Sequence, residues 1–96
     1  MNQLSLIRNT LSRFAPVLKE RYHVSSLGLF GSVVRSDFSS QSDIDIIVDF
    51  SQPIGVEFID LANELELLLN RRVDLVSKKG IKQNYLAQIE NEIVYV

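Results

Sequence analysis

The stretch FGSVVRSDFSSQSDIDIIVD, residues 30–49, decides how this 96-residue chain is interpreted. At its end, residues 43–50 (DIDIIVDF) alternate acidic and branched apolar residues and then become more continuously apolar. That pattern predicts a strand with one face in the core. A half-buried strand does not require acid at two successive outward positions. Asp43 and Asp45 are therefore either solvent-facing residues or ligands.

Three other segments carry apolar residues at steps of three and four positions, which is helical spacing. They predict helices over residues 2–20, 56–70 and 81–92. Pro16 lies late in the first helix and either kinks or ends it. In the second, the run ELELLLN places Leu67 off the main apolar face, so this leucine belongs either to the core or to a partner-facing stripe.

Short apolar runs predict the remaining strands. They cover residues 24–30 and 72–76, and the terminal EIVYV is either a strand tail or an extended segment packed on the sheet. The order helix, strand, turn, strand, helix, strand, helix is typical of a small α/β or α+β domain. We expect one domain over residues 1–96, with helices packed on one face of a small mixed sheet.

The composition excludes several classes of protein. The chain has no cysteine, which excludes a disulfide framework, a thiolate zinc site and a cysteine nucleophile. Its net charge of −2 disfavours an extended nucleic-acid-binding surface. The sequence shows neither a signal peptide nor an apolar run of about 20 residues, so we expect a cytoplasmic protein without a membrane span.

The acidic residues around the predicted strands suggest a metal site. Asp43 and Asp45 project from the same side of their strand, about 6.6 Å apart along it. Carboxylates at this spacing suit Mg²⁺, which usually keeps waters and phosphate oxygens as its other ligands. Asp74, in the run RRVDLV, is the candidate third carboxylate. Two carboxylates about 4 Å apart repel by about 4 kcal/mol at an effective dielectric of about 20, so a divalent cation is the simplest compensation.

The segment before the acidic pair supplies groups that bind an anion. Gly31 has no Cβ, so the backbone can approach a phosphate, and Ser32 can donate through its hydroxyl and amide. Arg35 can reach a phosphate oxygen with two N–H groups. Followed by Asp-x-Asp and a later strand Asp, this arrangement indicates metal-dependent phosphoryl or nucleotidyl transfer. Arg71 and Arg72 either steer a triphosphate or face solvent.

The stretch LFGSVVRSDFSSQSDIDIIVDF resembles the signature of the minimal nucleotidyltransferase (MNT) family, part of the DNA polymerase β-like superfamily. The run RRVDLV resembles that family's third-carboxylate strand, and the resemblance covers nearly the full chain. It implies the polymerase β-like nucleotidyltransferase fold, with Gly31 and Ser32 holding the triphosphate. It also implies that Asp43 and Asp45 bind two Mg²⁺ ions. Asp74 would complete the metal site and help activate the attacking hydroxyl.

Many small members of this family are antitoxins encoded beside a HEPN-domain toxin, which they are understood to silence by adding AMP to a toxin tyrosine. The resemblance therefore implies an ATP-using, Mg²⁺-dependent protein adenylyltransferase with a HEPN-type toxin as its partner. Two alternatives stay open: an antitoxin that masks its toxin without catalysis, and a nucleotidyltransferase of small molecules. One departure from the family pattern is the run Val34-Arg35-Ser36-Asp37, where the family often has Ala-Arg-Gly-Glu.

Overall fold

The computed structural model of the chain describes residues 3–35, 39 and 41–96. Ser36 and Asp37, the departures from the family pattern, lie outside the described residues. In chain order the elements are α1 (Gln3–Tyr22), β1 (Val24–Phe30), the 3₁₀ turn η1 (Gly31–Val34), β2 (Ile44–Phe50), α2 (Glu57–Leu69), β3 (Val73–Ser77), α3 (Gln83–Ile89), the 3₁₀ turn η2 (Glu90–Glu92) and β4 (Val94–Tyr95).

The strands of the described residues form one four-stranded mixed sheet in the order β3-β2-β1-β4. β1 pairs antiparallel with both β2 and β4, whereas β2 and β3 run parallel. A parallel pair needs a long crossover connection, and α2 supplies it here. β4 lies beside β1 at the edge of this sheet, so the segment EIVYV contributes a short edge strand. The predicted class of a small mixed sheet with packed helices is confirmed.

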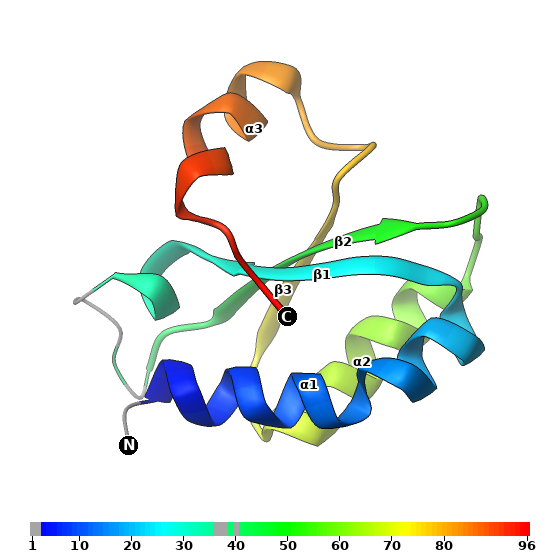
Figure 1. Ribbon diagram of the computed structural model, residues 1–96, viewed down its shortest axis with the longest axis horizontal. Helices are drawn as coiled ribbons and strands as arrows, with labels where there is room; N and C mark the ends of the chain where they lie inside the picture. Colours follow the sequence, from blue (N-terminus) through cyan, green and yellow to red (C-terminus); the bar gives the residue numbers. More distant parts are fainter. Residues whose placement is uncertain (1–2, 36–38, 40) are drawn as a thin grey trace.

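α1 and α2 cover one face of the sheet (Figure 1). Their apolar side chains form the main core with one side of β1 and β2; its fully buried members are Leu11, Leu18, Leu29, Ile44, Ile46, Val48, Leu61 and Leu65. Leu67 of α2 is 83% exposed and does not join this core. Among residues 3–35, 39 and 41–96, no helix combines the length and apolar character needed to cross a membrane.

α3 packs on the opposite face of the sheet (Figure 1), so the expectation of helices on one face holds for α1 and α2 alone. On this second face the buried residues are Phe30, Ile47 and Ile89. Ile47 points away from its neighbours Ile46 and Val48, because successive strand residues alternate faces. The continuously apolar end of β2 is thus the mark of a strand covered on both sides.

Pro16 neither ends α1 nor lies in the core, because the helix continues to Tyr22 and Pro16 is exposed. Proline has no N–H to donate to the carbonyl four residues earlier, which here belongs to Ser12. Ser12 is also exposed, so water can reach the carbonyl that Pro16 leaves without a helical partner.

Candidate active site

The acidic residues predicted from the sequence gather where β2 and β3 begin. The parallel register of these strands places Asp45 directly opposite Asp74, and Asp43 immediately precedes β2. Asp45 shares its face of β2 with Ile47, so the carboxylates lie on the face that α3 partly covers. Asp45 is half-buried, whereas Asp43 and Asp74 are exposed. The structure therefore brings the three predicted carboxylates together at one end of the sheet.

The electrostatics of Asp45 reflect this convergence. Burial, the charges of Asp74 and Asp43, and a hydrogen bond with Asp74 together raise the pKa of Asp45 to about 6, against the opposing effect of Arg35. A carboxyl group close to other carboxylates resists ionisation because its charge is repelled. Bound positive charge at this position would remove that repulsion.

The Gly31 turn lies against the same carboxylate. Phe30, the last residue of β1, pairs with Asp45, so the exit of β1 delivers Gly31 to the acidic cluster. Gly31 has a φ of 74°, and a Cβ there would collide with Oδ2 of Asp45. Only glycine satisfies both conditions, since a positive φ and a missing Cβ are both needed. Ser32 follows within η1, and Arg35 ends it.

The donor set suits a hard cation but does not by itself form a closed cage. Within the described ranges, no group of three or more His, Cys, Asp or Glu side chains is arranged to hold a metal ion. Mg²⁺ is usually bound through one or two carboxylates, with waters and substrate phosphates as its other ligands. Burial and the charges of Asp74 and Asp43 raise the pKa of Asp45, so the carboxylates of Asp43 and Asp45 fit an ion that arrives with a nucleotide.

Arg71 has a role that the sequence left open. Its guanidinium donates hydrogen bonds to the carbonyl oxygens of Ser39, at 2.9 Å, and of Ser42. It thereby holds the segment that leads into Asp43, which makes it a positioning group rather than a purely solvent-facing one. Arg72 is exposed and, with Asp43, lines a polar cavity of about 380 Å³.

Sequence patterns do not single out Glu92, yet it contacts the predicted phosphate-binding turn. Its Oε1 accepts a hydrogen bond from the N–H of Gly31 at 3.0 Å, and its Oε2 lies 3.8 Å from Nη1 of Arg35. Glu92 and Gly31 are 61 positions apart in the chain. No local signal reveals a contact of this range, because only the folded sheet brings η2 to the end of β1.

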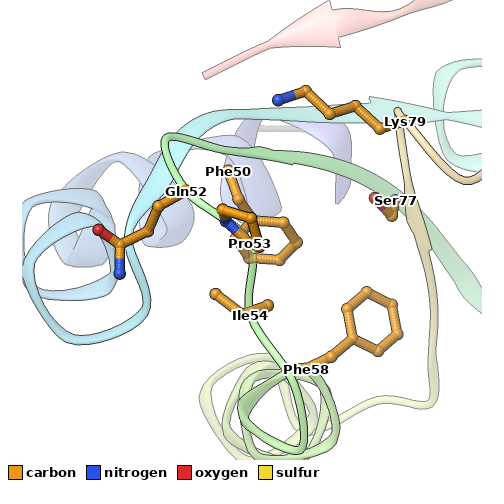
Figure 2. Close-up of a pocket in the computed structure, with 7 residues that line it drawn as sticks. All are labelled: Phe50, Gln52, Pro53, Ile54, Phe58, Ser77 and Lys79. Carbon is orange, nitrogen blue, oxygen red and sulfur yellow. The ribbon is translucent and has the colours of Figure 1, made fainter.

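An apolar pocket of about 320 Å³ lies at the other end of β2 (Figure 2). Its lining residues are Phe50, Gln52, Pro53, Ile54, Phe58, Ser77 and Lys79. Five residue steps along extended strand, about 16 Å, separate Asp45 from Phe50. The pocket has no acidic residue in its lining and is not part of the candidate active site.

Comparisons with known proteins find similar proteins over nearly the whole chain. Residues 11–96 match the model of a family described as the nucleotidyltransferase domain. Protein adenylyltransferase MntA of Thermococcus cleftensis is 41% identical over 97 residues, which cover 100% of this chain and 98% of that protein.

Solved structures show the same fold. A protein assigned as a minimal nucleotidyltransferase matches with a TM-score of 0.82 at 28% identity, covering 97% of this chain and 95% of that one. A chain from the structure of a tri-AMPylated Shewanella oneidensis HEPN toxin in complex with an MNT antitoxin matches with a TM-score of 0.70. That second match has 21% identity and covers 97% of this chain and 71% of that chain, so it bears on the fold alone.

Gly31→Ala is expected to destabilise the protein by about 1–3 kcal/mol, the usual range for a backbone held in a sparsely populated conformation. The new Cβ would meet Asp45, so Gly31 must change its φ or Asp45 must move. Gly55→Ala is the matched control, because the nearest atom to its Cβ would lie 3.7 Å away. Urea unfolding measures both; equal losses would contradict the close approach at Gly31.

Asp45→Asn is expected to stabilise the metal-free protein at pH 7. The pKa of Asp45 is raised from 3.8 to about 6 in the folded state, so folding becomes less favourable as the pH rises through this range. Asparagine cannot ionise, so the variant does not lose folding stability in this way. Its advantage should therefore be fully present at pH 7 and vanish below about pH 4.

Thermal unfolding in EDTA from pH 4 to pH 7 tests this expectation. Asp49→Asn is the matched control on the same strand, since Asp49 accepts a hydrogen bond from the N–H of Phe50 and lies outside the acidic cluster. If Asp45→Asn were destabilising at pH 7, the carboxylates would not be repelling one another.

Proposed function

Since this chain belongs to the nucleotidyltransferase domain family, we propose that it transfers AMP from ATP to a tyrosine hydroxyl of a partner HEPN toxin and thereby acts as the antitoxin. The observation that carries the proposal is the cluster of Asp43, Asp45 and Asp74 beside the Gly31 turn. Two comparisons support a protein as the acceptor: a relative over the whole chain is named a protein adenylyltransferase, and a neighbour in fold comes from the complex of an antitoxin with an AMPylated toxin. A reaction that consumes ATP favours the cytoplasm as its location.

The nucleotide would lie between the Gly31 turn and the acidic pair. Asp43 and Asp45 would hold two Mg²⁺ ions, which supply positive charge to offset the triphosphate and the carboxylates. The Gly31 amide and the Ser32 hydroxyl would donate hydrogen bonds to phosphate oxygens, and Arg35 would add charge-assisted ones. Together these groups fix the α-phosphorus for in-line attack, so positioning rather than covalent catalysis carries the rate.

Asp74 would act on the acceptor. It is exposed at the start of β3, directly opposite Asp45, where an incoming hydroxyl can reach it. Its carboxylate would accept the proton as the acceptor oxygen forms a bond to the α-phosphorus and the bond to pyrophosphate breaks. The exposure of Asp43 and Asp74 leaves this end of the sheet open, which suits an acceptor presented by a second protein.

Transfer of label from α-³²P-ATP to a HEPN toxin encoded beside this chain tests the proposal. Wild type with Mg²⁺ should label the toxin and abolish its toxicity. Asp43→Asn/Asp45→Asn should lose transfer by about 10²-fold or more, because it removes the groups that hold compensating charge. Asp49→Asn, in the same strand and outside the acidic cluster, should transfer normally.

The same experiment separates catalysis from masking. If the folded double variant still silences the toxin and no label appears with wild type, the protein neutralises by binding alone. Label on a small molecule rather than on the toxin would instead favour a small-molecule nucleotidyltransferase. Circular dichroism of each variant establishes that the loss of transfer is not a loss of fold.

A further inference from the structure

We propose that Glu92 occupies the phosphate-binding turn of the nucleotide-free enzyme and that the triphosphate must displace its carboxylate. Glu92 accepts a hydrogen bond from the Gly31 N–H at 3.0 Å and lies 3.8 Å from the Arg35 guanidinium. Gly31 and Arg35 are groups to which the proposed function assigns the phosphates, so the inference rests on that function. Glu92 is then a residue that sets the affinity for nucleotide.

The fold delivers Glu92 to this position from both sides of η2. Before it, Ile89 at the end of α3 is buried against the sheet. After it, β4 pairs with β1, and the N–H of Val96 donates to the carbonyl of Leu27 at 3.0 Å. Figure 1 shows the chain descending from α3 through this turn to β4. The carboxylate is thus presented to Gly31 by an anchored backbone.

Competition for the Gly31 amide is direct, because one N–H hydrogen makes one good hydrogen bond. While the Glu92 carboxylate accepts it, a phosphate oxygen cannot approach the same amide with proper geometry. The carboxylate also adds a negative charge to an end of the sheet that already holds Asp43, Asp45 and Asp74. A triphosphate carries negative charge too and is repelled until Glu92 moves away.

Moving the Glu92 carboxylate away from Arg35 costs little free energy. The Arg35 and Glu92 side chains are 54% and 30% exposed, and their ion pair is long. Ion pairs of this kind contribute little to stability, since water screens them. The effect on nucleotide affinity should therefore be modest, about three- to tenfold, rather than an on-off switch.

Binding of Mg²⁺–AMP-PNP to the folded protein, measured by calorimetry, tests the proposal. Glu92→Gln preserves size and removes the charge, and should bind about three- to tenfold more tightly than wild type at low salt. The difference should shrink as the salt concentration rises. Glu92→Ala, which also removes the hydrogen-bond acceptor, should bind Mg²⁺–AMP-PNP at least as tightly as Glu92→Gln does. Glu90→Gln, an exposed residue of the same turn, should bind like wild type.

The binding results distinguish a Glu92 that competes with phosphate from a Glu92 that supports the turn. Equal or weaker binding by Glu92→Gln and Glu92→Ala, at unchanged melting temperature, would overturn the inference and make Glu92 a support of the turn. If neither wild type nor the variants bind Mg²⁺–AMP-PNP, the proposed function fails and this inference fails with it. In a wild type that binds, the Gly31 amide resonance should shift on adding nucleotide, and Glu92→Gln alone should also shift it.

Discussion

The parallel pairing of β2 with β3 sets Asp45 directly opposite Asp74, and the rest of the site is arranged around the resulting repulsion. Burial makes the ionised form of Asp45 unfavourable, and the charges of Asp74 and of Asp43, one step before β2, make it less favourable still. A sheet that only had to be stable would gain from apolar or neutral residues here. The arrangement is understandable when a cation and a phosphate chain complete it.

The main hydrophobic core and the acidic cluster lie on opposite faces of the sheet. One face, packed against α1 and α2, contains the fully buried leucine and isoleucine side chains other than Ile47, and their burial stabilises the fold. The other face holds the acidic cluster, and α3 packs beside it on the region of Phe30, Ile47 and Val76. Successive residues of β2 therefore serve different purposes: Ile44 and Ile46 point into the core, and Asp45 points to the opposite face, where the acidic cluster lies.

Local sequence patterns predicted the strands and the turn of the site. They missed the features that depend on contacts between residues far apart in the chain. Alternation in DIDIIVDF located β2 and assigned both acids to one face, and the glycine after β1 marked the turn that approaches them. The position of α3 on the second face was missed, because Ile47 signals two-sided burial only once the sheet order is known. The contacts of Arg71 and Glu92 join distant segments and leave no periodic trace. The catalytic roles of the acids stay predictions.

We infer that the carboxylates at the start of β2 and β3 form a metal and nucleotide site. A crystal structure with Mn²⁺ and AMP-PNP, in which the anomalous signal locates manganese, is the measurement that tests this inference. We expect manganese between the carboxylates of Asp43 and Asp45, with the phosphates at the Gly31 turn. Manganese elsewhere, or the nucleotide in the apolar pocket beside Phe50 with these carboxylates unliganded, would contradict it.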